Sequence, residues 1–140
     1  MKYIILLAYL LCFSVGAKAQ TLKAMEPELK KKIALACRLT DKNQIKRMNE
    51  LHQTLFKKVS GFKEHSQSYE LVFEGSNDTI IGELAEFIKF ERQCCPWLVF
   101  HLTFEPDEGA ISLTMGNSDE TKQMVYLVME LEKLSIDQSR

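Results

Sequence analysis

The feature that most constrains the fold is the N-terminal segment, because it decides how much of the 140-residue chain is left to form a domain. Lys2 gives a basic start, an apolar run extends from Tyr3 to Val15, and Ala17-Lys18-Ala19 follows. This order is typical of a secretory signal peptide, and the run is shorter than the about 20 residues that cross a bilayer. We predict that residues 1–19 are cleaved, that no membrane span remains, and that the mature protein is periplasmic or secreted.

The rest of the chain is long enough for one domain with one hydrophobic core. We predict a lead-in over residues 20–32, a single domain over 33–136 and a tail over 137–140. The chain has 18 Lys and Arg residues and 19 Asp and Glu residues, so its net charge is −1. The two signs are mixed, and no basic surface indicates a nucleic-acid partner. The sequence does not indicate an oligomeric state.

Capping residues, turn residues and hydrophobic periodicity divide the domain into helices and strands. They predict helices over residues 41–58, 79–94 and 119–134, and strands over residues 68–74, 97–104 and 110–115. The order α-β-α-β-β-α predicts an α+β two-layer sandwich with a three-stranded, mainly antiparallel sheet and helices on one face. It is compatible with a ferredoxin-like arrangement that lacks its last strand.

Cleavage of the signal peptide would change the cysteine count. Cys12 lies in the apolar run and leaves with it, so Cys37, Cys94 and Cys95 remain. An odd number of cysteines in an exported protein leaves at least one thiol without an intramolecular partner, unless a metal ion or another chain binds it.

Glu91 lies near the middle of the apolar face of the second predicted helix when that helix is drawn at 100° per residue. Cys94 and Cys95 flank the same face one turn later. A carboxylate there needs a partner, because an unpaired buried charge is unfavourable. The sequence leaves open an ion pair with Arg38 or Arg47, protonation, or coordination of a metal ion.

The three cysteines admit two main interpretations. In an oxidising compartment Cys37 could form a disulfide with Cys94 or Cys95 and attach the N-terminal segment to the second helix. Alternatively, all three could bind a soft metal ion such as zinc, copper or mercury, with Glu91 or His52 nearby. A thiol-redox protein or enzyme is less favoured, because the two later cysteines end a helix, where the dipole opposes a thiolate.

The residues that carry this chemistry also carry a resemblance. They are Cys37-Arg38-Leu39-Thr40, Arg47, Tyr69, Phe73 and the segment from Glu91 to Phe100. Together they resemble a group of small bacterial proteins of uncharacterised activity with the pattern C-x-L-T followed by E-x-x-C-C-P-F-L-x-F. Trp97 stands where that pattern has phenylalanine, and the signal peptide is also unusual for it. The resemblance implies an association with metal or mercury resistance.

These observations favour a small exported binding domain with a cysteine-centred site for a soft metal ion. The predicted ligands are Cys37, Cys94, Cys95, Glu91 and His52. The alternative is a structural or interaction domain held by a disulfide, without a metal.

Overall fold

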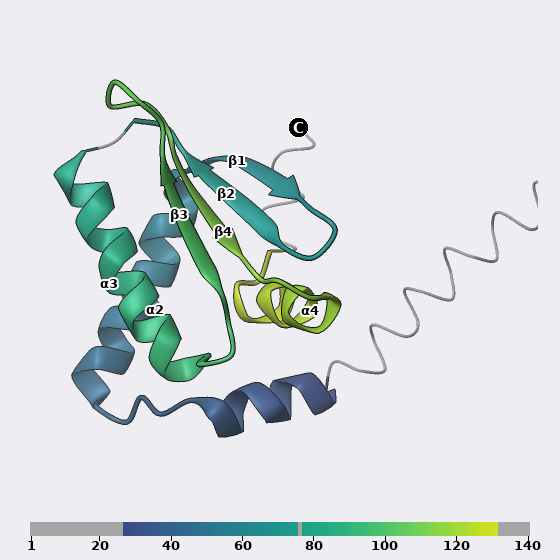
Figure 1. The fold of residues 1–140 in the computed structure, drawn as a ribbon. Coiled ribbons are helices and arrows are strands. Elements are labelled where there is room, and N and C mark those ends of the chain that lie inside the picture. The colour runs from purple at the N-terminus through teal and green to yellow at the C-terminus, as the bar shows by residue number, and fades with distance from the viewer. Residues whose placement is uncertain (1–26, 76, 132–140) are drawn as a thin grey trace, which may run out of the picture.

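The computed structural model describes residues 27–75 and 77–131 (Figure 1). The predicted signal peptide, the first part of the predicted lead-in and the predicted tail lie outside these residues. The described residues form four α-helices and one four-stranded antiparallel sheet, which confirms the α+β class.

The first described element is a helix over residues 27–36. The elements that follow are α2 (Lys42–Leu55), the 3-10 helix η1 (Phe56–Lys58), β1 (Val59–Glu64), β2 (Tyr69–Phe73), α3 (Asp78–Cys94), β3 (Phe100–Phe104), β4 (Ile111–Met115) and α4 (Asp119–Val128).

The predicted helix starts are confirmed by their capping contacts. The side chains of Asp41, Asn77 and Ser118 each accept a hydrogen bond from the backbone N–H three residues later. Such a bond satisfies one of the N–H groups that the first turn of a helix leaves unpaired. These local contacts begin α2, α3 and α4 within one residue of the positions that the sequence predicts.

The prediction of three strands was wrong, because a fourth strand, β1, forms one edge of the sheet. The strand order is β1-β2-β4-β3, and every neighbouring pair is antiparallel. Ser60 and Gly61 look like the end of a helix, but here they lie within β1. The pairing of β1 with β2 shifts register between Val59 and Gly61, so β1 lacks the regular alternation that marks a strand.

Two elements are shorter than predicted. β3 begins only at Phe100, because the N–H of Leu98 is used in a tight turn after α3. α4 ends at Val128 and not at Leu134, and Glu130 beyond it has a φ of 49°. A backbone in this left-handed region cannot continue an α-helix.

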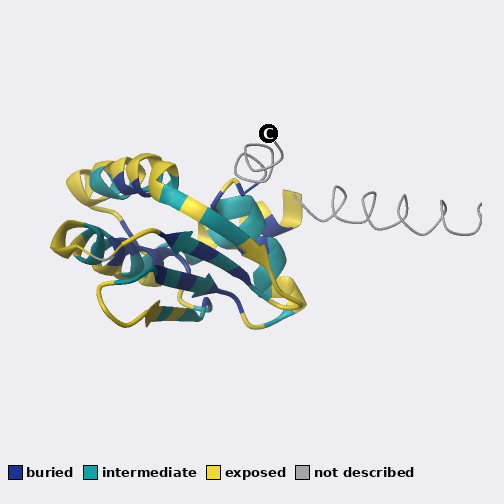
Figure 2. Cartoon of the chain, turned by 90° about the horizontal axis from the view of Figure 1, so that it is seen from above, coloured by how far each residue is buried: buried dark blue, intermediate teal, exposed yellow. Residues whose placement is uncertain are grey.

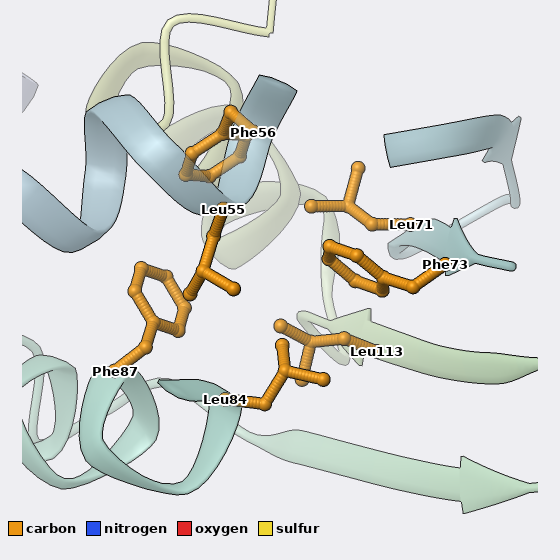
Figure 3. A pocket seen from close by; sticks show the side chains of 7 residues that line it. All are labelled: Leu55, Phe56, Leu71, Phe73, Leu84, Phe87 and Leu113. Carbon is orange, nitrogen blue, oxygen red and sulfur yellow. The ribbon is translucent and has the colours of Figure 1, made fainter. Parts of the chain in front are cut away.

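The core lies between the helices and one face of the sheet (Figure 2). Alternate residues of the two central strands are buried on that face: Tyr69, Leu71, Phe73, Ile111, Leu113 and Met115. Helices α2 and α3 lie side by side over it. Figure 3 shows where apolar side chains of α2, η1 and α3 meet those of the sheet: Leu55, Phe56, Leu71, Phe73, Leu84, Phe87 and Leu113. This packing fixes how α2 faces α3.

The opposite face of the sheet is polar. Lys63 lies beside Glu70 across β1 and β2, and Ser112 of β4 donates a hydrogen bond of 3.0 Å to Glu70. This alternation of apolar and polar residues is typical of an antiparallel sheet with one face in solvent. None of the helices in the described ranges is long and apolar enough to cross a membrane.

Candidate functional site

The five predicted site residues lie together around one open pocket at the C-terminal end of α3. The pocket is also bordered by α2, by the helix over residues 27–36 and by the residues after α4. Its lining includes all of the predicted ligands: Cys37, His52, Glu91, Cys94 and Cys95. Segments that are far apart in the sequence therefore meet here.

A disulfide joins Cys37 to Cys94 and closes a loop with a sequence separation of 57. The N–H of Arg38 also donates a hydrogen bond of 3.0 Å to the carbonyl of Gln93, so the backbones are held together beside the disulfide. Figure 1 shows the N-terminal helix lying next to the end of α3. Of the two disulfides that the sequence left open, the structure has the one to Cys94.

The disulfide changes the set of thiols in the pocket. Cys95 is the free cysteine of the described residues, and it is buried with 1% of its surface exposed. While Cys37 and Cys94 are bonded to each other, they cannot act as thiolate ligands. The described residues also contain no group of three or more His, Cys, Asp or Glu side chains placed to hold a metal ion.

Glu91 is buried with 1% exposure, as its position on the apolar face of α3 predicts. Its Oε1 lies 2.5 Å from Nε2 of His52 on α2. Of the partners that the sequence left open, Arg47 does not pair with Glu91: it pairs with Glu86 at 2.8 Å, nearer the surface. The packing of α2 on α3 brings His52, and not Arg47, over Glu91.

The histidine is held in place by neighbouring aromatic rings. The ring centre of His52 lies 5.2 Å from that of Phe87 and 5.6 Å from that of Phe56. These contacts restrict the ring, which keeps Nε2 directed at Glu91. His52 is therefore a positioned pocket residue.

The second carboxylate oxygen of Glu91 is less well satisfied. Oε2 is buried, and no nitrogen or oxygen donor of the described residues reaches it. Buried polar atoms usually have a hydrogen-bond partner, and one without a partner calls for an explanation such as a bound ion. The thiol of Cys95 makes a hydrogen bond with the Glu91 carboxylate, and a thiol is a weak donor.

Burial raises the pKa of the Cys95 thiol to about 12, and the charge of Glu91 and its hydrogen bond with the thiol add to this effect. A thiol with so high a pKa is protonated at neutral pH and reacts poorly as a nucleophile. This agrees with the expectation that the end of a helix is an unfavourable place for a reactive thiolate. A metal ion can still displace the proton of a thiol ligand.

The sequence analysis missed two methionines in this pocket. Met48 lies one helical turn before His52 on α2, and its Sδ is 3.9 Å from Sγ of Cys94. Met129, which follows α4, is buried and lines the same pocket. Met48 lies on the apolar side of α2, where a methionine is usually a core residue. Its spacing of four residues from His52 was the signal that it shares a face with a candidate ligand.

No family model, curated protein or solved structure matches the chain. Its function therefore has to be inferred from the residues of the pocket and from their chemistry.

Proposed function

We propose that this protein is a small exported binding domain whose cysteine-centred pocket takes up a soft metal ion after the Cys37–Cys94 disulfide is reduced. The observation that carries the proposal is the convergence of three cysteines, His52 and Glu91 on one pocket. Sulfur and imidazole donors suit zinc, monovalent copper and mercury. Buried Glu91 would favour a cation near its unpaired oxygen.

Reduction would change the pocket from one free thiol to three. A thiol reductant supplies two electrons and two protons to the Cys37–Cys94 bond and is itself oxidised to a disulfide. The two released sulfur atoms start from bonding distance, with Cys95 next to one of them in the chain. Metal uptake would then release the thiol protons.

Export and the resemblance stated above belong to the same proposal. The disulfide supports export, because disulfides form in oxidising compartments. The resemblance supports a site in common with that group of bacterial proteins, because four of the residues that carry it line the pocket: Cys37, Glu91, Cys94 and Cys95. We also propose that β1 takes the sheet position of the last strand of a ferredoxin-like fold, because it pairs with β2 at the edge.

The test is metal binding by the purified mature protein before and after reduction. Thiol counting should give one free thiol before reduction and three after it. Zinc, copper(I) and mercury(II) are then titrated into both forms, and we expect tight uptake of one ion by the reduced form. His52→Ala should weaken this uptake. The matched control His101→Ala removes an exposed histidine of β3 and should leave it unchanged.

A second candidate function is favoured by the disulfide itself. The bond between Cys37 and Cys94 attaches the N-terminal segment to α3, as expected for a structural or interaction domain that binds no metal. If the reduced protein loses its fold and neither form takes up any of the three metals, this second function is supported and the metal proposal is wrong.

A further inference from the structure

The pocket contains a sulfur donor of a different kind from its cysteines. Met48 carries a thioether, which needs no deprotonation and cannot form a disulfide. Its Sδ lies 3.9 Å from Sγ of Cys94, so a cysteine and a methionine sulfur are already neighbours in the pocket wall. Met129 adds a second thioether to the same lining.

Resting on the proposed function, we infer that Met48 is a ligand in this pocket and that the ion bound there is a soft monovalent cation, copper(I) or silver(I). The juxtaposition of Met48 with Cys94 carries the inference. Thioether and thiolate sulfur together select copper(I). Zinc sites in proteins use cysteine, histidine and carboxylate ligands, and thioethers are not among them.

A second, independent observation indicates that the pocket favours a cation. Glu91 is 1% exposed and lines the pocket, and its Oε2 has no nitrogen or oxygen donor among the described residues. The carboxylate is too hard a donor to be a preferred ligand of copper(I), but its charge would stabilise a cation held by the sulfur atoms nearby. Lys57 of η1 is a basic residue that also lines the pocket, and its side chain is exposed at the rim.

The thioether also adapts to the ion. Methionine is unbranched and has several rotatable bonds, so its sulfur can move toward a bound ion without a change in the backbone. Met48 is only partly buried, and it belongs to a well-formed helix that also presents His52 to the pocket. Small side-chain movements of Met48 would therefore let its sulfur approach an ion held by Cys94.

The test compares copper(I) and zinc(II) on the reduced full mature chain under anaerobic conditions. Met48→Leu keeps the size and apolar character of the side chain but removes the sulfur. We expect copper(I) affinity, measured by competition with a chromogenic chelator, to fall about tenfold while zinc(II) affinity is unchanged. The matched control Met115→Leu changes a core methionine of β4 that does not line the pocket, and it should leave both affinities unchanged.

A second measurement avoids any dependence on the folding of the variant. Selenomethionine-labelled protein with the natural sequence is loaded with copper(I), and X-ray absorption at the copper edge should show a selenium neighbour. Equal copper(I) affinities for the natural protein and Met48→Leu, or copper without a selenium neighbour, would overturn the role of Met48 while leaving metal binding intact. Failure of the natural protein to bind either ion would overturn both proposals.

Discussion

Two carboxylates on opposite sides of the sheet differ in how fully the rest of the chain satisfies them. Glu70, on the polar face, accepts hydrogen bonds from Lys63 at 2.9 Å and Ser112 at 3.0 Å, and it lies 2.8 Å from His65. Glu91, in the pocket, has His52 on one oxygen and no nitrogen or oxygen donor on the other. The first carboxylate is satisfied by its own chain, whereas the second is not.

Under the proposed function, Glu70 stabilises the fold and Glu91 lies beside the bound ion. The partners of Glu70 lower its pKa to about 2, with the hydrogen bond from Lys63 as the largest cause. Both oxygens of Glu70 therefore have hydrogen-bond partners within the described residues. The pocket instead contains atoms that could bind a ligand: Oε2 of Glu91, the thiol of Cys95 and the thioethers of Met48 and Met129.

The disulfide beside Glu91 should give the largest effect. Cys37→Ser should lower the free energy of unfolding by about 4 kcal/mol in the chain-entropy model, because the disulfide closes a long loop. Urea denaturation measures this loss. Hydrogen exchange should increase first around residues 27–41 and not at the β1–β2 hairpin that holds Glu70. Equal loss of protection in both regions would contradict a local role for the disulfide.

Replacing either carboxylate by an amide should destabilise the protein less than Cys37→Ser does. The two amide variants should also differ from each other. Glu70→Gln should destabilise the protein by about 1 kcal/mol, because it loses charge-assisted hydrogen bonds from Lys63 and Ser112. Glu91→Gln keeps its size and a hydrogen bond to His52, so its effect on urea denaturation should be smaller. Only Glu91→Gln should weaken metal uptake. Weaker metal uptake by Glu70→Gln, or a larger loss of stability in Glu91→Gln, would contradict the contrast between the two carboxylates.

Alkaline titration tests the raised pKa of the Cys95 thiol in the pocket. Stability at neutral pH should not depend on this pKa. The Cys95 thiol has a pKa of about 12 in the folded protein, compared with an ordinary value of 9.0. Between these values only the unfolded chain releases the proton, so the free energy of unfolding should fall as the pH rises above 9. Cys95→Ala should remove this part of the pH dependence. A parallel pH profile for Cys95→Ala and the natural protein would show that the thiol is not perturbed.

Acid titration tests the polar face in the same way. Glu70 has a pKa of about 2 in the folded protein, compared with an ordinary value of 4.5. Below pH 4.5 the unfolded chain binds the proton first, so the stability that Glu70 contributes should be lost as the pH falls toward 2. The difference in stability between the natural protein and Glu70→Gln should therefore shrink over this range. A constant difference would contradict the network around Glu70.

Most elements of the fold could be predicted from the sequence, because they depend on local signals. The capping residues Asp41, Asn77 and Ser118 begin their helices as predicted, and the alternation in β2 and β4 gives the buried face. β1 could not be predicted in this way, since the register shift beside Gly61 breaks its alternation and its pairing with β2 is a contact between strands. A strand whose residues do not alternate can be recognised only from its pairing with a neighbouring strand.

The burial of Glu91 on α3, with Cys94 and Cys95 close by, follows from the sequence, because the helical repeat places these residues on one face. That His52, 39 positions away, is the partner of Glu91 and that Cys37 bonds to Cys94 follow from the tertiary packing and from no local pattern. Both choices depend on how α2 and the N-terminal helix pack against the end of α3. The pocket exists because that packing brings together side chains that no local pattern connects.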